Sequence, residues 1–379
     1  MKSGSGVVRV IYHISKELVQ RGHDVTILSP SFRHDSDGDK KALLSDPFVL
    51  DGIKIHYFPY SVCYRYFCVM PKLIPYFKKN IDAFDVAHVH DTRSFQGIIM
   101  HHYAAQHGLP YVSQLHGSYL EPINGYKPKW LLDNLFSRRI LADSKRVIAL
   151  TETETKYYER CGIAEERVDS IGNGIEFSKY QAAQRGAFRK RFGISPDERV
   201  ILYLGRIARS KGIDLLVEAF SELRNRFESV KLVIVGPDSD YDSGYASSLR
   251  NKVNRMNLRD STLFTGPVDE YDKINAYTDA DVFVTPRFTG FPLTFLESCA
   301  CGTPIVTTRD ADSIDWIDGF VGFVTVDNKT GLAEAITTIL CDHQIRERFE
   351  HNCKTLAQRF AWPSVVDKIE ETYRRAAGN

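Results

Sequence analysis

Short apolar runs alternate with longer amphipathic stretches along almost the whole chain. The apolar runs are bounded by polar residues, glycine or proline, as buried strands are. The intervening stretches carry apolar residues at helical spacing, most clearly at 7–21, which Gly22 closes as a C-cap, and at 213–227. Repeated βα units of this kind form parallel sheets covered by helices. The pattern therefore predicts an α/β fold.

The strands fall into two groups, which predicts two domains. Between the groups lies 172–193, a polar, glycine-containing and aromatic-poor stretch in which we place a hinge. The predicted domains are 1–175, 176–355 and a final helical segment, 356–379, whose amphipathic part at 362–373 is long enough to pack back on the first domain. The predicted strands are Val25–Leu28, Val86–Val89, Tyr111–Leu115, Arg146–Leu150, Val200–Leu204, Lys231–Val235, Leu263–Phe264, Val282–Thr285, Pro304–Val306 and Gly322–Val324.

The first domain is expected to lack its first strand. A doubly wound domain begins with a strand that leads into a glycine loop, but here Gly4-Ser5-Gly6 follows Met1 almost at once. Either the sequence starts late or the sheet lacks an inner strand, which would leave apolar edges exposed.

Composition narrows the class of protein. The 379 residues include 49 Lys plus Arg and 48 Asp plus Glu, a net charge of +1, which argues against a general nucleic-acid-binding protein. The seven cysteines are odd in number and scattered, so we expect reduced cysteines and no metal site. No apolar run approaches the roughly 20 residues of a membrane helix, and no secretory leader is found. We therefore expect a cytoplasmic protein.

The glycine loop at Gly4 and Gly6 could hold a phosphate, because a helix N-terminus presents N–H groups and partial positive charge. A plain turn fits the same residues. A dinucleotide-binding loop would need a third glycine where Arg9 stands, and an acid where Ser29-Pro30-Ser31 follows the next strand. Binding of NAD is therefore disfavoured.

Two loops in the second half are better candidates for a diphosphate site. The strand at 200–204 runs into Gly205-Arg206 and then Lys211-Gly212, and ligands of open α/β sheets lie beyond such strand ends. Arg206 and Lys211 could together neutralise a diphosphate, although a solvated basic loop is the alternative.

The second loop follows the strand at 282–285. Backbone N–H groups around Phe291 to Thr294 could hold a phosphate, and Glu297 could accept two hydrogen bonds from a ribose diol. Glu297 could equally be a first-turn acid that complements the helix dipole.

Taken together, these segments resemble a GT-B glycosyltransferase of the large retaining family 4, the glycosyl transferases group 1. The matching segments are the glycine loop, Arg21–Val25, Asp85–His90, Leu115–Gly117, Asn173–Glu176, Gly205-Arg206, Lys211-Gly212, Val235-Gly236, Phe291–Pro304 and Phe360–Trp362.

The resemblance implies two Rossmann-like domains that face each other across a cleft, with a C-terminal helix that returns to the first domain. It implies sugar transfer, with retention, from a nucleotide diphosphate-sugar, UDP- or GDP-linked, to a hydroxyl of a glycan, glycolipid or lipid-linked saccharide. The first domain would bind the acceptor and the second the donor, in polysaccharide or cell-envelope biosynthesis. No cofactor and no metal are required by this expectation, since the cations can stabilise the leaving group.

The resemblance also assigns roles to residues. Arg206 and Lys211 would bind the donor diphosphate, Glu297 the nucleotide ribose, and His116 would lie at the reacting centre, so that His116, Arg206 and Lys211 form the catalytic set. Without the resemblance, His116 fits a structural histidine, and we interpret His88 and His90 as packing or cleft-wall residues. The donor-binding set is Gly4, Gly6, Gly205, Arg206, Lys211, Gly236, Thr289, Gly290, Phe291, Pro292, Leu293, Thr294 and Glu297.

One departure from the family pattern concerns Thr289. The family usually has a glutamate there, which contacts donor-sugar hydroxyls, and threonine cannot supply a carboxylate. The alternatives are a nucleotide-sugar epimerase or phosphorylase on the same scaffold, or a non-catalytic nucleotide-sugar-binding protein.

The segment 54–80 is aromatic and basic and contains no acid. Such a composition suits an anionic membrane surface or a lipid-linked acceptor, and a peripheral membrane contact is our hypothesis. Burial of the aromatics in the first domain is the alternative. The residues concerned are Tyr57, Phe58, Tyr60, Tyr64, Tyr66, Phe67, Tyr76, Phe77, Lys54, Arg65, Lys72, Lys78 and Lys79.

Overall fold

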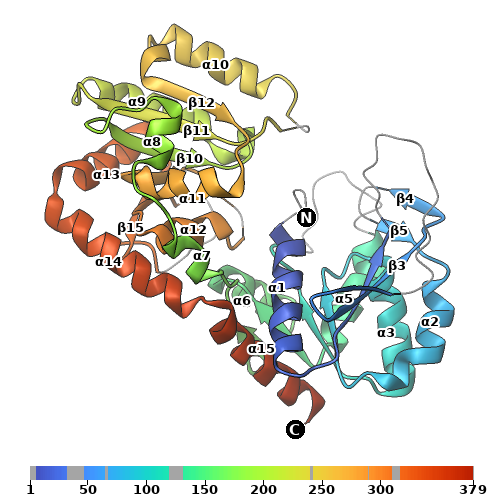
Figure 1. Ribbon diagram of the computed structural model, residues 1–379. Helices are drawn as coiled ribbons and strands as arrows, with labels where there is room; N and C mark the ends of the chain where they lie inside the picture. The colour runs from blue at the N-terminus through green and yellow to red at the C-terminus, as the bar shows by residue number, and fades with distance from the viewer. Residues whose placement is uncertain are drawn as a thin grey trace. The chain divides into compact units, whose positions relative to one another are not determined.

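The structure is a computed structural model. It describes residues 6–31, 47–64, 67–118, 131–239, 242–288, 290–309 and 316–378. Contacts divide the chain into unit 1, residues 1–173 with 362–379, and unit 2, residues 174–361 (Figure 1). Both units contain parallel sheets with helices, so the predicted α/β class is confirmed. Gly4 and Thr289 lie outside the described residues.

Unit 2 is built on a six-stranded sheet of order β12-β11-β10-β13-β14-β15, and its neighbouring strands all pair in parallel (Figure 1). Each strand that the sequence predicted here is present. The elements are α7 Phe177–Gln181, α8 Ala187–Phe192, β10 Arg199–Leu204, α9 Ile213–Arg224, β11 Val230–Val235, α10 Tyr245–Arg255, β12 Thr262–Gly266, α11 Glu270–Asp279, β13 Val282–Thr285, α12 Leu293–Cys301, β14 Ile305–Thr308, β15 Gly322–Thr325, α13 Lys329–Cys341 and α14 His343–Arg359.

Both faces of this sheet are covered. Val282 and Val284 of β13 lie in one apolar cluster with residues of α9, α10 and α13. Phe283, between them, points to the other face and contacts Tyr277 of α11 and Phe295 of α12, with ring centroids 5.3 and 6.1 Å apart. A strand buried on both faces has no polar alternation, which is why the sequence shows it as a continuous apolar run.

Unit 1 contains two sheets instead of one continuous sheet, and the smaller is mixed, since β1 pairs with β3 in parallel and β2 pairs with β3 antiparallel. Strands β1-β3-β2 form one sheet, β6-β7-β8-β9 form another, and β4 and β5 form a hairpin. In a doubly wound sheet the first strand lies between the second and the fourth, and the break between β1 and β6 falls at that position. The elements are α1 Gly6–Gln20, β1 Thr26–Pro30, β2 Phe48–Leu50, β3 Ile53–Phe58, β4 Val62–Tyr64, β5 Phe67–Val69, α2 Leu73–Asn80, β6 Ala87–His90, α3 Phe95–His107, β7 Tyr111–Gln114, α5 Arg138–Asp143, β8 Arg146–Ala149, α6 Glu152–Arg160, β9 Val168–Ser170 and α15 Trp362–Ala377.

The C-terminal helix α15 packs on unit 1, as the sequence predicted. Arg21, just after α1, donates hydrogen bonds to Asp367, Glu370 and the carbonyl of Pro363, at 2.7, 2.8 and 2.7 Å. On the inner side of the helix, Val366 is fully buried. The predicted boundary at 355 falls inside α14, because the helix break that separates α14 from α15 lies at Phe360 and Ala361.

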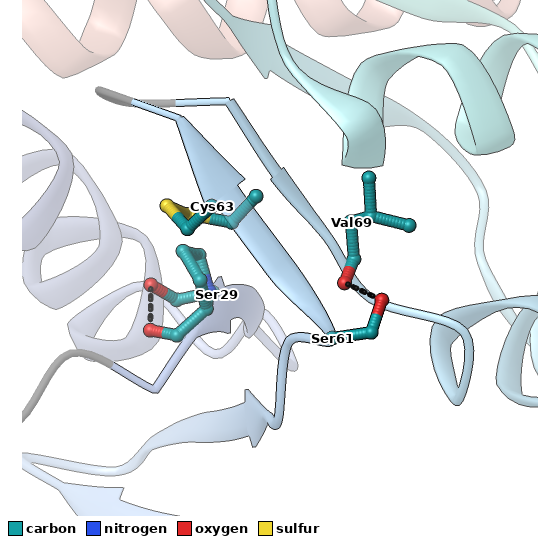
Figure 2. The surroundings of a disulfide bond; sticks show 6 residues. Ser29, Ser61, Cys63 and Val69 are labelled. Atoms are coloured by element: carbon teal, nitrogen blue, oxygen red, sulfur yellow. Dashed lines mark hydrogen bonds between the residues drawn. A yellow bond between two sulfur atoms is a disulfide. The ribbon is translucent and has the colours of Figure 1, made fainter.

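The hairpin of β4 and β5 corrects the interpretation of the cysteines. Cys63 and Cys68 are cross-strand partners and form a disulfide, so the expectation of seven reduced cysteines is wrong at these two (Figure 2). Ser61 closes the hairpin by donating its backbone N–H to the carbonyl of Val69, at 2.9 Å. The pairing depends on local strand register, which a count of cysteines cannot detect. The cysteine content therefore no longer supports a cytoplasmic location, which stays a prediction.

The stretch at 172–193 is more regular than its composition suggested. It contains α7 and α8, both in unit 2. Asp279 at the end of α11 accepts hydrogen bonds from the backbone N–H groups of Gly186 and Arg189, which fixes the start of α8. The hinge predicted here stays a prediction.

None of the helices in the described part of the chain combines the length and apolar character needed to span a bilayer.

Candidate active site

The carboxyl ends of β10 and β11 meet in unit 2. The backbone N–H of Gly205 donates to the carbonyl of Val235, at 2.9 Å. A Cβ on Gly236 would lie 2.0 Å from the carbonyl oxygen of Gly205, and Gly236 has a φ of 139°. Only glycine fits at 236, because any side chain would force these two loops apart.

Arg206 and Lys211 follow β10 at this edge of the sheet. Arg206 is exposed and Lys211 is half-buried. Burial lowers the pKa of the Lys211 ammonium, and the positive charge of Arg206 lowers it further. Within the described residues, no carboxylate forms an ion pair with either of them. Two neighbouring cations that form no ion pair in the described part of the chain provide a site for an anion.

The loop of Lys211 packs on the loop that follows β13. The backbone N–H of Arg287 donates to the carbonyl of Lys211, at 3.3 Å. Gly212 has a φ of 65°, and a Cβ there would lie 3.1 Å from Pro286, so this contact also favours glycine. Arg287 is itself paired with Asp327, at 2.6 Å. The structure thus brings the two predicted diphosphate loops side by side.

The second loop leads from Gly290 into α12. Gly290 and Phe291 are buried, and Pro292, Leu293 and Thr294 are half-buried. The helix begins at Leu293 without a hydrogen bond from a capping side chain. Phe291 packs against the rings of Trp316 and Phe360, at 6.1 and 5.6 Å between centroids. This aromatic contact holds the loop at the start of the helix, where N–H groups favour an anion.

Glu297 is more deeply embedded than the sequence suggested. Only 4% of the residue is exposed. Lys273 of α11 donates to Oε1 at 2.8 Å, and the hydroxyl of Tyr277, one turn further along α11, donates to Oε2 at 3.2 Å. A carboxylate has about four acceptor positions, and these two contacts use one on each oxygen. Sequence reasoning missed Lys273 and Tyr277, because they precede Glu297 by more than 15 residues and lie on another helix.

His116 and Gly6 lie in unit 1. Gly6 is the first residue of α1. His116 follows β7 with a φ of 53°, a left-handed conformation that is unusual for a residue other than glycine. Burial lowers the pKa of His116 to about 4, so the ring is neutral at pH 7. The prediction that this histidine is displayed at the end of a strand agrees with the structure, and its catalytic role stays a prediction.

A contact that the sequence interpretation missed is the one between His90 and His116. Nδ1 of His90 lies 2.9 Å from Nε2 of His116. The contact depends on strand register, which residue patterns do not encode: β6 and β7 pair in parallel with His90 opposite Gln114, two residues before His116. Side chains two residues apart on a strand share a face, so His88 and His90 of β6 are directed to the same side of this sheet.

The aromatics of 54–80 divide between core and surface. Phe58 and Phe77 are buried in the core of unit 1, as the alternative interpretation expected. Tyr57, Tyr60 and Tyr64 are exposed, and Val62 is 64% exposed. Arg65 and Tyr66 lie outside the described residues.

Comparisons with known proteins identify the class. A sequence model for "Glycosyltransferase Family 4" matches residues 4–179, and one for "Glycosyl transferases group 1" matches residues 184–356. The crystal structure of Anabaena Alr3699/HepE in complex with UDP and glucose is similar, with a TM-score of 0.74 and 18% sequence identity over 98% of this chain and 96% of that one. WaaG, a glycosyltransferase involved in lipopolysaccharide biosynthesis, is similar with a TM-score of 0.67 and 16% identity over 100% of this chain and 97% of that one.

These likenesses, with the two α/β units, define a GT-B fold. Because the two sequence models together match most of the chain, it belongs to the glycosyl transferases group 1, with a first half of the Glycosyltransferase Family 4 type. Among curated relatives, D-inositol 3-phosphate glycosyltransferase 2 of Catenulispora acidiphila is 28% identical over 247 residues, 63% of this chain. The match covers 58% of that relative's length.

Proposed function

We propose that this protein transfers a sugar from a nucleotide diphosphate-sugar to an acceptor hydroxyl, with retention of configuration. The observation that carries the proposal is the pair of cations, Arg206 and Lys211, at the carboxyl edge of the unit 2 sheet, where no described carboxylate neutralises them. Family membership supports it, as does the UDP bound to the similar HepE.

The cations would act on the leaving group. As the bond between the sugar C1 and the phosphate oxygen breaks, negative charge grows on the diphosphate, and fixed positive groups stabilise that charge more than they stabilise the ground state. The acceptor oxygen forms its bond to C1 on the face that the diphosphate leaves, and the acceptor proton passes to the departing phosphate oxygen. Retention follows from this geometry without a carboxylate nucleophile, unlike the paired carboxylates of retaining glycosidases.

The donor site is tested first by binding and then by turnover. UDP, GDP and ADP are titrated by calorimetry, and UDP-glucose, GDP-mannose and ADP-glucose are compared by release of the nucleoside diphosphate with an acceptor panel. For Lys211→Ala we expect turnover to fall by about 10²- to 10³-fold, because one transition-state donor is lost. Lys190→Ala, an exposed lysine of α8, is the matched control.

The outcomes separate the competing functions. Wild-type turnover in Lys211→Ala would contradict the proposed role of the cations. Conversion of the donor without an acceptor would indicate an epimerase, a requirement for free phosphate would indicate a phosphorylase, and tight binding without turnover would indicate a binding protein. Activity that survives a chelator is expected, because the proposed leaving-group stabilisation uses no metal.

We also propose that unit 1 contacts an anionic lipid surface, from which a lipid-linked acceptor would be taken. The hairpin of β4 and β5 and the neighbouring helix α2 expose apolar and aromatic side chains beside lysines, a combination that suits the boundary between headgroups and acyl chains. No acid lies between 54 and 80 to oppose the attraction. The exposed residues are Tyr57, Tyr60, Val62, Tyr64, Ile74, Lys72, Lys78 and Lys79.

Charge reversal tests the lipid contact. Vesicles of phosphatidylcholine with phosphatidylglycerol are sedimented with the protein, and the triple change of Lys72, Lys78 and Lys79 to Glu is expected to abolish most binding, since each basic residue near an anionic surface contributes about 1 kcal/mol. The control carries the same change of charge at Lys145, Lys190 and Lys368, which are also exposed. Equal binding by both triple variants would refute the contact.

A further inference from the structure

Three histidine rings form a row at one edge of the unit 1 sheet. His88 and His90 lie on the same face of β6, with ring centroids 3.9 Å apart. The rings of His90 and His116 are 5.1 Å apart and nearly parallel, at 24°. At the other end of the row, the hydroxyl of Tyr373 from α15 lies 2.8 Å from Nδ1 of His88. In the described part of the chain, no group of His, Cys, Asp or Glu side chains is placed to hold a metal ion. Hydrogen bonds join His90 to His116 and Tyr373 to His88, whereas His88 and His90 meet by ring contact.

The backbone that carries this row is held in an unusual conformation. Both His116, at a φ of 53°, and Asp91, at 67°, adopt the left-handed region after their strands. The N–H of Asp91 donates to the carbonyl of Gln114, at 3.0 Å, which ties the two turns together. Such conformations cost about 1–3 kcal/mol each and persist only where the surroundings enforce them.

A buried acid enforces the turn after β7. Glu154 of α6 is fully buried, and it accepts hydrogen bonds from the backbone N–H groups of Gly117 and Leu150. The backbone at His116 is therefore fixed independently of any histidine. This contact does not determine how the His116 ring is rotated or which of its nitrogens carries the proton.

We propose that His90 is the positioning residue for His116: its Nδ1 holds Nε2 of His116, so that the His116 ring keeps one orientation and presents Nδ1 to the substrate. A hydrogen bond between two imidazole nitrogens needs one donor and one acceptor. If His90 carries its proton on Nδ1, then Nε2 of His116 accepts and Nδ1 of His116 carries the proton. In the opposite tautomer, Nδ1 of His116 is an acceptor. In both cases, the tautomer of His90 determines whether Nδ1 of His116 is a hydrogen-bond donor or an acceptor.

The electrostatics of the row agree with this arrangement. Burial lowers the pKa of His88 to about 3 and keeps the pKa of His90 well below its usual range, and the neighbouring histidines add to both shifts. Burial disfavours the charged form of each ring, and charging a second ring would add repulsion between neighbouring cations. All three rings are therefore neutral at pH 7, and a neutral histidine can orient a hydroxyl or accept its proton.

The inference rests on the proposed role of His116, so the experiment separates the two. Protein labelled with ¹⁵N-histidine is examined at pH 7 by long-range ¹H–¹⁵N spectra, which distinguish the Nδ1–H and Nε2–H tautomers. The signals of His90 and His116, among 12 histidines, are assigned from single variants. We expect one neutral tautomer for His116 in the unaltered protein.

Two amide variants provide the matched comparison. In His90→Asn the amide occupies the position of Nδ1, and in His90→Gln it occupies the position of Nε2. We expect His90→Asn to keep a single His116 tautomer. In His90→Gln, the two neutral tautomers of His116 should both be populated. We expect kcat for transfer from UDP-glucose, GDP-mannose or ADP-glucose to fall by about 10- to 100-fold, the loss that is typical when the hydrogen-bond partner of a functional histidine is removed. The KM for the donor should change little. Unchanged melting temperatures control for folding.

The outcomes are distinct. An unchanged His116 tautomer and unchanged turnover in His90→Gln would overturn the inference. In the double variant His90→Gln with His116→Ala, we expect no loss beyond that of His116→Ala, because His90 acts through His116. Wild-type turnover in His116→Ala alone would contradict the proposed role of His116, whereas the spectra would still decide whether His90 positions it.

Discussion

At the scale of single residues, the proposed donor site depends on partners that orient its ligating groups. Glu297 is the clearest case, because Lys273 and Tyr277 occupy one acceptor position on each of its oxygens. These two contacts hold the carboxylate in one orientation. A ribose diol binds best to a carboxylate that is held in this way, since little rotamer entropy is lost on binding.

This arrangement makes a prediction for Tyr277→Phe and Lys273→Met. Both are expected to weaken UDP binding through Glu297. For Tyr277→Phe, which removes the hydroxyl, we expect the dissociation constant to rise about tenfold, which corresponds to about 1.4 kcal/mol. Lys273→Met also leaves a buried carboxylate without its cation, so its unfolding free energy should fall by about 3–5 kcal/mol. Calorimetry with UDP, 2′-deoxy-UDP and 3′-deoxy-UDP measures the effect.

The deoxy nucleotides identify the contact. If Glu297 binds the ribose, Tyr277→Phe should weaken UDP more than it weakens the analogue that lacks the contacted hydroxyl. Equal weakening for all three nucleotides would show that Glu297 is a structural acid of α12 and not a ribose ligand.

The sequence could predict Arg206, Lys211 and Glu297, because each stands at a recognisable position beside a strand end or a helix start. It could not predict their environment. Lys273 and Tyr277 belong to a different helix, and His90 meets His116 only because β6 and β7 pair in one particular register. Contacts of this kind depend on tertiary packing, which local residue patterns do not encode.

At the scale of elements, strands that are buried on both faces were predictable, and strands β2 to β5 and β9 of unit 1 were not. β13 is an uninterrupted apolar run, whereas β3 alternates buried and exposed residues and β4 exposes Val62 and Tyr64. The aromatic and basic composition of residues 54–80 indicated an exposed surface, so no strands were predicted there. The hairpin and its disulfide depend on the register between β4 and β5, which the residue pattern does not encode.

The motif Arg21-Gly22-His23 has a structural explanation at this scale. Arg21 donates to Asp367, Glu370 and Pro363, and Nε2 of His23 lies 3.0 Å from Glu370. The hydrogen bonds from His23 and Arg21 lower the pKa of Glu370. The motif therefore joins the end of α1 to α15.

We expect Arg21→Ala to destabilise unit 1 by about 1–2 kcal/mol, a modest value because Asp367 is largely exposed and its ion pair is screened by solvent. A carboxylate with a lowered pKa stabilises the fold above its unfolded pKa, and this stabilisation is lost as the pH falls through the folded value. The difference in unfolding free energy between the unaltered protein and Arg21→Ala should thus be largest at pH 7 and decrease below about pH 4.5. Urea denaturation at pH 7 and pH 4 measures it, and a constant difference would contradict the assignment.

At the scale of the whole molecule, the chain completes unit 1 only at its end. Residues 174–361 form unit 2, and α15 then returns to unit 1. Unit 2 has its own six-stranded sheet, its own core and both predicted diphosphate loops. Nucleotide binding should therefore depend on unit 2 alone, whereas transfer is expected to require His116 of unit 1, whose catalytic role the family resemblance predicts.

Val366→Asp tests this division, because it places a charge at a fully buried position of α15. We expect unit 1 to lose more than about 4 kcal/mol, since an unpaired buried charge is among the most damaging single changes. Hydrogen exchange followed by mass spectrometry should then show faster exchange in β6 to β8 but not in β10 to β14. Calorimetric binding of the nucleoside diphosphate should persist while transfer is lost. Ser364→Asp, which adds the same charge on the exposed side of α15, controls for charge alone. Loss of nucleotide binding together with unit 1 would mean that the donor site does not belong to unit 2 by itself, and the roles of Arg206 and Lys211 would then have to be reassigned.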